Sequence, residues 1–276
     1  MVTIQIGGVV IRHILLVLLF SGFAFSAGLN PFYRAGIIGG DTVKDIDPVA
    51  KSTVLLIGKI GRGSFTCSAV LIERDILLTA GHCLGAPGWA KLEAHFKLDK
   101  KNSGPVIPVV KQLRPFVTQA FDRASDQDDI AVLKLKTPAP ANYQVATMIT
   151  DPSLIKNGMT LIQAGYGRNV VKDGFMGKTG IGTLRQKKQT VINSHYGQKE
   201  FLMSIEGGGA CKGDSGGPAY LEMNGQLYLA GIASRMSKNN RVMENGKEEY
   251  YCTKDMIFTF VPTQMNWIQS NIQAMK

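Results

Sequence analysis

The sequence predicts an all-β protein. Beyond Ile37, short apolar runs alternate with Gly, Pro and Asn breaks, and many short strands separated by turn residues are typical of a sandwich or a barrel. No extended alternation of strand and helix patterns appears, which disfavours a parallel sheet. Only the C-terminal end shows the spacing of apolar residues that a helix requires.

The expected elements follow from these patterns in chain order. The apolar runs that we expect to form strands are residues 53–57, 69–72, 76–78, 130–133, 160–162 and 227–233. A Pro-rich stretch without periodicity predicts a linker between two β halves, over about 137–144. Met265, Ile268, Ile272 and Met275 recur at spacings of three and four, which places them on one face of a C-terminal helix.

The composition is that of a globular protein. Hydrophobic residues make up 45% and charged residues 19% of the chain, which excludes a mostly disordered or collagen-like protein. Lys and Arg exceed Asp and Glu by 31 to 21, so the net charge is +10. A positive balance favours encounter with acidic surfaces. Because no Lys/Arg-rich block, RNP-type motif or zinc-knuckle spacing occurs, we expect no nucleic-acid partner.

The N-terminal residues have the pattern of a secretory signal peptide. Arg12 and His13 precede the apolar run 14–20, and small residues follow up to Ser26. A membrane anchor needs about 20 apolar residues, and this run is shorter. We therefore expect a signal peptide over 1–26 and a secreted protein, extracellular or periplasmic, without a membrane partner after cleavage. Its four cysteines can form two disulfides in that compartment.

Side chains suited to nucleophilic catalysis occur in three segments. They are Thr-Ala-Gly-His-Cys at 79–83, an Asp pair with an apolar run at 128–135, and Cys-Lys-Gly-Asp-Ser-Gly-Gly-Pro at 211–218. Taken singly, the last segment is a turn, the acid borders a strand and the His beside a Cys is structural. Together, in the order His, Asp and Ser, they indicate a catalytic site.

The chemistry explains why these residue types occur together. A serine hydroxyl is a weak nucleophile at neutral pH, and His82 is the residue whose pKa suits removal of the proton from Ser215. A carboxylate, Asp128 or Asp129, would fix the tautomer of that histidine. Glycines around the serine let backbone N–H groups reach a developing oxyanion. We expect no cofactor and no metal, since the sequence holds no C-x-x-C or H-x-x-x-H pair.

These motifs resemble those of the chymotrypsin/trypsin family of serine endopeptidases. The resemblance is carried by Ile-Ile-Gly-Gly at 37–40, by 79–83, 129–133 and 213–218, and more weakly by Gly-Tyr-Gly at 165–167 and Trp-Ile at 267–268. The small number of cysteines resembles a bacterial-type member with few disulfides. The family likeness implies two packed antiparallel six-stranded β-barrels and a C-terminal α-helix, with the active site between the barrels.

The resemblance also implies a division of the chain and a mechanism. The protease domain would span 37–276, with the first barrel at about 37–136 and the second with the helix at about 145–276. Ser215 would attack a peptide carbonyl, with His82 as the base and Asp129 orienting it. Asp129 is chosen over its neighbour because it directly precedes the apolar strand, as in the family pattern.

The oxyanion hole and the disulfides follow from the same resemblance. The N–H groups of Gly213 and Ser215 would bind the oxyanion. The implied disulfides are Cys67 with Cys83 and Cys211 with Cys252. The cysteine count alone allows three connectivities.

Activation is implied by the residues at the start of the domain. In this family, cleavage before an Ile such as Ile37 releases an α-amine that pairs with the acid before the serine, here Asp214. The likeness therefore implies a zymogen with a short propeptide over 27–36. Gly36 departs from the usual Lys or Arg at that junction.

The family likeness places several residues at the substrate pocket. Gly209 occupies the position of the acid in trypsins, with Ala210 beside it. An ungapped alignment places Met256 on the pocket wall, which favours small or apolar side chains before the cleaved bond. A one-residue gap places Asp255 there instead and restores a preference for basic ones. We favour the ungapped alignment because it is simpler.

Other positions near the pocket depart from the family pattern. Ser234 matches the strand that pairs with substrate backbone, and Arg235 replaces the aromatic residue that usually follows. Lys212, Arg235 and Lys238 would make the rim basic. The polar stretch between Met236 and Cys252 is expected to be a solvated surface insertion.

Two functions are consistent with these patterns. The first is a serine endopeptidase that acts as a monomer on polypeptide substrates and can meet a protein protease inhibitor. The second is a catalytically silent binding protein on the same fold. It is favoured by Arg235 and by the Gly36 junction, which both depart from the family pattern. The intact set of His82, Asp129 and Ser215 favours the enzyme.

Overall fold

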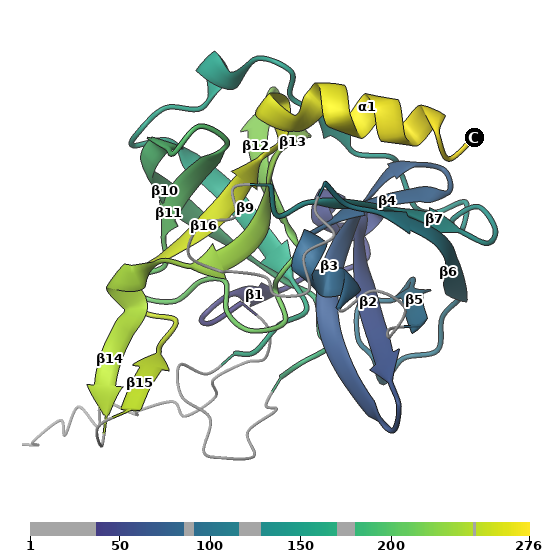
Figure 1. Ribbon diagram of the computed structural model, residues 1–276, viewed down its shortest axis with the longest axis horizontal. Coiled ribbons are helices and arrows are strands. Elements are labelled where there is room, and N and C mark those ends of the chain that lie inside the picture. Colours follow the sequence, from purple (N-terminus) through teal and green to yellow (C-terminus); the bar gives the residue numbers. More distant parts are fainter. Residues whose placement is uncertain (1–36, 86–90, 116–127, 170–179, 245–246) are drawn as a thin grey trace, which may run out of the picture. The chain divides into compact units, whose positions relative to one another are not determined.

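Two six-stranded antiparallel β-barrels and a C-terminal helix make up the described part of this computed structural model (Figure 1). The structure describes residues 37–85, 91–115, 128–169, 180–244 and 247–276, all within one compact unit. The predicted all-β class with two barrels is therefore confirmed. The expected signal peptide and propeptide lie outside the described residues.

The first barrel closes in the order β2-β3-β4-β7-β6-β5. Its strands are β2 (Thr53–Ile60), β3 (Gly63–Glu73), β4 (Ile76–Thr79), β5 (Lys91–His95), β6 (Val106–Leu113) and β7 (Ala131–Leu135). Two short 3-10 helices flank them, η1 (Pro48–Lys51) and η2 (Gly81–Leu84). The strands expected in this half are found here. The sequence did not indicate β5 and β6, because exposed polar residues interrupt their apolar pattern.

The second barrel closes through pairing of β9 with both β10 and β12. Its strands are β9 (Thr160–Gly165), β10 (Arg185–Tyr196), β11 (Glu200–Ser204), β12 (Pro218–Met223), β13 (Gln226–Met236) and β16 (Asp255–Phe260). The short strand β8 (Thr147–Met148) adds to β13 in parallel, and the 3-10 helix η3 (Pro152–Leu154) follows it. The two strands expected in this half lie within β9 and β13.

The start of the described chain belongs to the second barrel rather than the first. Strand β1 (Asp41–Thr42) pairs with β10, and the Ile38 amide donates to the Gly209 carbonyl at 2.9 Å. Ile37 and Ile38 are both buried in the core of the second barrel. These apolar side chains therefore pack in the second barrel, although the strands of the first barrel follow them in the chain.

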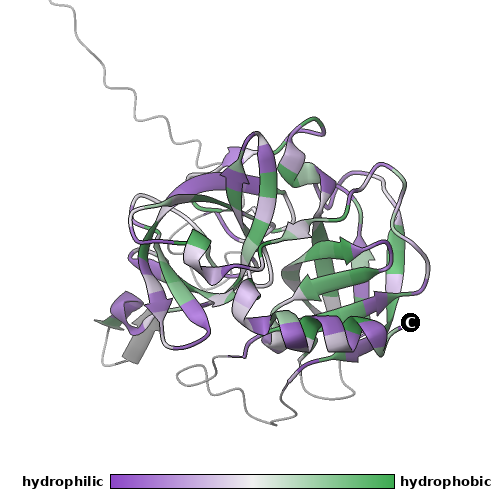
Figure 2. Cartoon of the chain, turned by 90° about the horizontal axis from the view of Figure 1, so that it is seen from above, coloured by the Kyte–Doolittle hydropathy of each residue, from purple (hydrophilic) through white to green (hydrophobic). Residues whose placement is uncertain are grey.

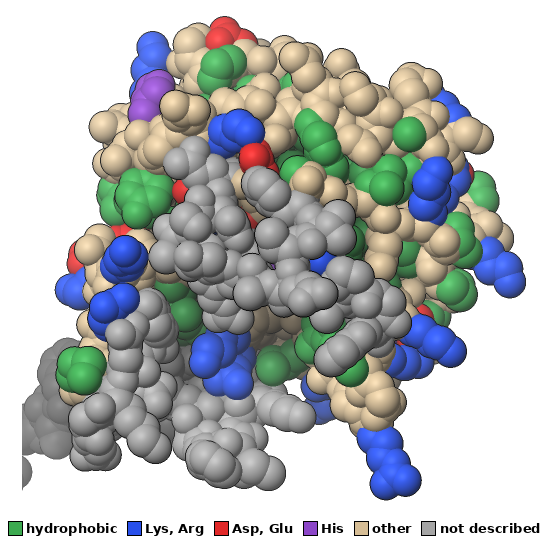
Figure 3. Space-filling view, in the orientation of Figure 1, with side chains coloured by type: hydrophobic (Ala, Val, Ile, Leu, Met, Phe, Trp, Pro, Cys, Tyr) green, Lys and Arg blue, Asp and Glu red, His purple; other side chains and the backbone are tan. Residues whose placement is uncertain are grey.

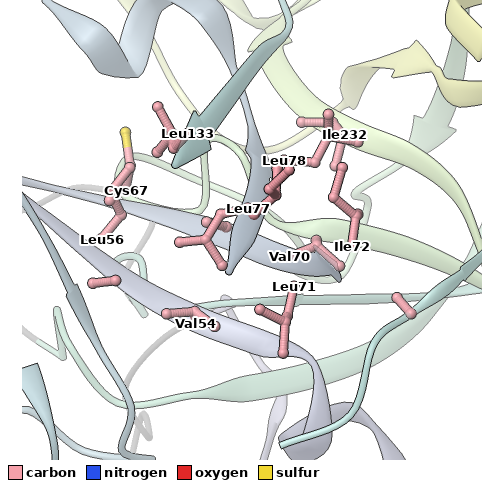
Figure 4. Close-up of a cluster of buried hydrophobic side chains, with 14 of the residues drawn as sticks. Val54, Leu56, Cys67, Val70, Leu71, Ile72, Leu77, Leu78, Leu133 and Ile232 are labelled. Carbon is pink, nitrogen blue, oxygen red and sulfur yellow. The ribbon is translucent and has the colours of Figure 1, made fainter. Parts of the chain in front are cut away.

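The core of the first barrel extends across the boundary between the barrels. Figure 4 shows Leu77 and Leu78 of β4 among side chains of β2, β3 and β7, with Ile232 of β13 in the same cluster. Neighbouring residues of β3, such as Val70 and Leu71, are both fully buried, since the strand is covered on two faces. Burial of a Leu or Val side chain contributes about 1.5–3 kcal/mol. This shared core fixes the two barrels against each other.

The C-terminal helix α1 (Met265–Gln273) follows a proline-containing 3-10 turn, η5 (Val261–Gln264). Ile268, Ile272 and Met275 are buried in the core of the first barrel, which confirms the predicted apolar face. Figure 2 shows hydrophobic and hydrophilic residues alternating along this helix. Among the described residues, no helix is long and apolar enough to cross a membrane.

The polar stretch between β13 and β16 forms a hairpin. A short turn, η4 (Lys238–Asn240), leads into β14 (Arg241–Glu244), which pairs with β15 (Lys247–Tyr250) beside the second barrel (Figure 1). The buried Asn240 binds the Asp255 carbonyl and accepts from the amides of 253 and 254. Charged residues hide the strand pattern in the sequence. The side chains of 241–243 are exposed, as expected for a surface insertion.

Basic side chains are spread over the surface. On the face shown in Figure 3, the described Lys and Arg side chains lie at several separate places. Several described lysines, wherever they lie on the surface, are paired with acids. Examples are Lys59 with Glu93 at 2.7 Å and Lys188 with Glu222 at 3.1 Å. The net charge of +10 is therefore not gathered into one patch on that face.

Candidate active site

His82 lies on η2, directly after the buried strand β4. A disulfide between Cys67 and Cys83 joins this turn to β3, which confirms the expected pairing. The ring Nδ1 lies 2.8 Å from Asp129 Oδ2, and the His82 amide donates to Asp129 Oδ1 at 2.9 Å. Its side chain is 22% exposed. One carboxylate thus holds both the backbone and the ring of His82.

Asp129 lies just before β7 and is almost fully buried. Besides the two bonds from His82, its Oδ2 accepts from the Ser234 hydroxyl at 2.6 Å. Burial alone would raise the pKa of Asp129, but the charge of His82 and the hydrogen bonds from His82 and Ser234 hold that pKa below its ordinary value. A carboxylate only accepts, so Nδ1 of His82 carries a proton and Nε2 is the basic atom of the neutral ring.

The neighbouring acid, Asp128, has different partners. Its carboxylate binds Lys199 Nζ at 2.7 and 2.9 Å and accepts from Gln264 Nε2 at 2.6 Å. Asp128 therefore ties the start of β7 to the second barrel and to η5. Of the two acids that the sequence left open, Asp129 is the one that contacts His82.

Ser215 lies in the tight turn before β12, half-buried. The turn is anchored on β13, since the Gly216 amide donates to the Ala233 carbonyl at 2.7 Å. The Ser215 carbonyl accepts from the Ser68 amide of the first barrel at 2.7 Å. The Cys83 sulfur lies 3.7 Å from that carbonyl oxygen and 4.0 Å from His82 Nε2. The three residues predicted to form a triad thus come together between the barrels.

The backbone around Ser215 can receive an anionic oxygen. Gly213 has a φ of +98°, and a Cβ there would lie 2.8 Å from Gly167 Cα, so only glycine fits. Within the part of the chain that the structure describes, the amides of Gly213 and Ser215 donate to no protein acceptor. Two unengaged N–H donors on a rigid turn are the arrangement that stabilises an oxyanion.

The second buried aspartate, Asp214, directly precedes Ser215 in this turn. Its oxygens accept from the amides of Gly167 at 2.7 Å and Cys211 at 2.8 Å, and the Ile37 amide also donates to it. Burial outweighs these bonds and raises the pKa of Asp214 to about 7. A Cβ at Gly165 would overlap the carboxylate. The Gly-Tyr-Gly segment thus makes room for Asp214, and Ile37 lies beside it as the resemblance implied.

The residues expected at the substrate pocket fall into two environments. Met256 and Ala210 lie in one apolar cluster with the Cys211–Cys252 disulfide, which confirms the second expected pairing. Asp255 precedes Met256 in β16 and so points to the opposite face, where its carboxylate accepts from Asn239 at 2.7 Å.

Gly209 and the expected basic rim complete this region. A Cβ at Gly209 would overlap the Ile205 side chain. Lys212 and Lys238 are exposed. Arg235 does not contribute to the rim: it is 8% exposed and pairs with Glu200 through contacts of 2.5 and 3.0 Å.

Three contributions to this site were missed at the sequence level. Glu200 is the first residue of β11, and Lys199 directly precedes that strand. Neither was singled out, although Glu200 is the one acid in the strand. The hydroxyl of Thr259 donates to the Asp129 carbonyl at 2.9 Å. All three act on residues distant in the sequence, so no local motif marks them.

A metal site is not available at His82. Among the described residues, Cys67, His82 and Cys83 are the group whose ligand atoms lie within 4.8 Å of one another. Both cysteines are oxidised in one disulfide and offer no thiolate.

Comparisons with known proteins agree with this geometry. The sequence model of the family described as Trypsin matches residues 37–255. Duodenase-1 of Bos taurus is 27% identical over 260 residues, 90% of this chain and 94% of that protein. Chymase of Papio hamadryas is 27% identical over 223 residues, with shares of 76% and 81%. Mast cell protease 2 of Meriones unguiculatus is 32% identical over 189 residues, with shares of 64% and 71%. These relatives are animal proteins and do not support the expected bacterial-type likeness.

Proposed function

This chain belongs to the trypsin family of serine proteases, and we propose that it is an active endopeptidase that hydrolyses peptide bonds through Ser215, His82 and Asp129. The observation that carries this proposal is the 2.8 Å contact between His82 Nδ1 and the ionised, buried Asp129, beside a half-exposed serine. A carboxylate placed there stabilises the imidazolium that forms when His82 takes a proton.

The reaction proceeds in two acyl transfers. In the first, His82 Nε2 removes the hydroxyl proton as Ser215 Oγ attacks the peptide carbonyl, and the imidazolium then protonates the leaving amine. The Gly213 and Ser215 amides stabilise the oxyanion of the tetrahedral intermediate. In the second, His82 activates a water that hydrolyses the acyl-enzyme and returns the proton to Ser215. In the first transfer the proton of Ser215 therefore leaves on the amine, and in the second the water supplies the proton that Ser215 regains.

Activation by cleavage before Ile37 is the second part of the proposal. The protein would be secreted after loss of a signal peptide over 1–26 and would carry a propeptide over 27–36. Ile37 is fully buried and its amide contacts Asp214. A new α-amine at this place would supply the positive charge that a buried carboxylate with a pKa of about 7 lacks.

The proposed substrates are polypeptides with a small or apolar residue before the cleaved bond. Met256 and Ala210 share an apolar cluster, and Gly209 offers no charge. Asp255, the residue that would favour basic side chains, is buried and hydrogen-bonded to Asn239. We also propose that the enzyme acts as a monomer and that protein protease inhibitors are potential partners.

A fluorophosphonate probe tests the catalytic proposal. The protein beginning at Ile37 is expected to gain one probe mass at Ser215, measured by intact-mass spectrometry. Ser215→Ala is the control and should gain none while keeping its circular dichroism spectrum. A folded chain that begins at Ile37 and stays unlabelled would instead support a catalytically silent binding protein. A panel of peptides that differ only before the cleaved bond then tests the pocket.

A further inference from the structure

Behind the proposed triad lies a second buried charge pair. Glu200 on β11 and Arg235 on β13 are 2% and 7% exposed in their side chains. Their two contacts, Nη1 to Oε1 and Nη2 to Oε2, give the forked geometry in which guanidinium and carboxylate bind most strongly. Arginine stays charged in a protein interior, so the guanidinium of Arg235 is a fixed positive charge at the site.

The pair is linked to His82 through a continuous line of side chains. Arg235 Nη1 donates to Ser234 Oγ at 3.2 Å. Ser234 Oγ donates to Asp129 Oδ2 at 2.6 Å. Asp129 Oδ2 in turn lies 2.8 Å from His82 Nδ1. A guanidinium only donates, and a hydroxyl has a single hydrogen. The bond from Arg235 therefore directs the Ser234 hydroxyl hydrogen towards Asp129.

We propose that Arg235 and Glu200 are positioning residues of the triad, which fix the Ser234–Asp129 hydrogen bond and balance the charge behind His82. This inference rests on the proposed function for its catalytic meaning. Three carboxylates, those of Asp128, Asp129 and Glu200, lie close enough for their charges to interact. Lys199 pairs with the first and Arg235 with the third. Asp129 is thus the carboxylate whose charge is left for the imidazolium.

The other charged groups around His82 define what must stay constant in a test. Arg114 at the end of β6 donates to the Gly81 carbonyl on the same turn as His82. Lys212 and Asp214 lie on the loop that carries Ser215, one exposed and one buried. Asp128 and Lys199 form their own pair. None of these groups is altered in the variants below, so their effects cancel between variants.

The balance predicts a shift in one single variant and its reversal in the double variant. Glu200→Gln leaves the Arg235 charge uncompensated, which disfavours the imidazolium and lowers the pKa of His82. Arg235→Gln leaves Glu200 without its cation, and because burial already raises the pKa of Glu200, that carboxyl binds a proton and its charge is lost. This variant and the double variant, which both lack the two charges, should keep the pKa of His82 close to the wild-type value. A purely structural role would not restore the pKa in the double variant.

The measurement is an NMR titration of the His82 ring in the chain that begins at Ile37, which needs no activity. Glu222→Gln is the matched control, since it removes one acid from an exposed pair of the same barrel and should leave His82 unchanged. Arg235→Lys keeps the charge and should titrate like the wild type. Arg235→Met, which also removes the charge, replaces Arg235→Gln if that variant does not fold.

Two results would overturn the inference. One is a His82 pKa that does not fall in Glu200→Gln, and the other is a double variant that keeps the full shift of Glu200→Gln. The pH dependence of fluorophosphonate labelling is the second readout, and its acidic limb should move with the NMR pKa. If no protein is labelled but the His82 pKa falls in Glu200→Gln and returns in the double variant, the endopeptidase proposal fails and the positioning pair stands.

Discussion

Two buried aspartates at the candidate active site have pKa values that are shifted in opposite directions. Asp129 and Asp214 are 1% and 0% exposed, so both lose the solvation of a charged carboxylate. The pKa of Asp129 is held below its ordinary value, whereas the pKa of Asp214 is raised to about 7. The difference therefore lies in their partners and not in their burial.

The two aspartates differ in whether an ionisable side chain is hydrogen-bonded to them. Asp129 accepts hydrogen bonds from a backbone amide and a hydroxyl, and in addition faces the imidazole of His82, which can carry a positive charge. Asp214 accepts from backbone amides, and the charge of the buried Arg185 lowers its pKa without offsetting burial. Backbone amides and the charge of Arg185 do not bring the pKa of Asp214 below neutrality. The contacts with His82 and Ser234 hold the pKa of Asp129 below its ordinary value.

The largest expected effect comes from changing the carboxylate that has such a partner. Asp129→Asn keeps the shape but places an amide donor against Nδ1, so the ring proton moves to Nε2 and the base is lost. We expect labelling of Ser215 to slow by about 10⁴-fold. The probe reaction of the variant and of the wild type, both beginning at Ile37, measures this ratio. A loss of less than tenfold would show that Asp129 does not set the tautomer.

The raised pKa of Asp214 predicts a pH-dependent stability of the uncleaved chain. Between its ordinary pKa of 3.8 and about 7, the folded state binds more protons than the unfolded state, so stability falls as the pH rises through that window. At about 1.4 kcal/mol per pKa unit, the fall is on the order of 4 kcal/mol.

Urea unfolding of the Ser215→Ala protein between pH 4 and 8 measures this slope. The same protein beginning at Ile37 is the comparison, because its α-amine should pair with Asp214 and remove the fall. Equal slopes in the two forms would contradict the proposed ion pair. The fall expected for Asp214 is opposite in sign to the contribution of Asp129, which is lost as the pH decreases.

The sequence predicted those features of the fold and of the candidate site that short local motifs encode. The strands of both barrels that have continuous apolar runs, the helix face at Ile268 and Ile272, and the positions of His82 and Ser215 all follow from short patterns. The choice of Asp129 over Asp128 required the family pattern, since both precede the same strand. Asp214 and Ile37 were likewise paired by resemblance alone.

What the sequence could not predict depends on contacts between distant strands. Arg235 was expected to contribute to a basic rim, yet it pairs in the interior with Glu200, 35 positions away. The hairpin at β14 and β15 has too few apolar residues to show a strand pattern. The described chain begins in the second barrel, where β1 pairs with β10. That pairing depends on the register of distant strands and not on local composition, so the sequence did not indicate it.

The close packing of Gly165 against Asp214 can be tested by its effect on stability. Gly165→Ala would place a methyl group into the carboxylate, so we expect a loss of about 3 kcal/mol in the free energy of unfolding. Gly63→Ala is the matched control, since its nearest neighbour lies 3.5 Å away and it is exposed. That change should stay within about 0.5 kcal/mol. Urea unfolding at pH 5, where Asp214 is mostly protonated, measures both. Similar losses would show that the loop carrying Asp214 adjusts freely.

The smallest effect tests how much the hydroxyl adds to the charge of His82 in keeping Asp129 ionised. Ser234→Ala removes the 2.6 Å bond to Oδ2 and leaves the two bonds from His82 in place. A hydrogen bond to a charged group contributes about 1.5–3 kcal/mol, so labelling of Ser215 should slow by roughly ten- to a hundredfold at neutral pH. Ser234→Thr retains the hydroxyl and should recover most of the rate. If Ser234→Ala matched Asp129→Asn in its loss, the hydroxyl rather than the imidazole would be the partner that separates Asp129 from Asp214.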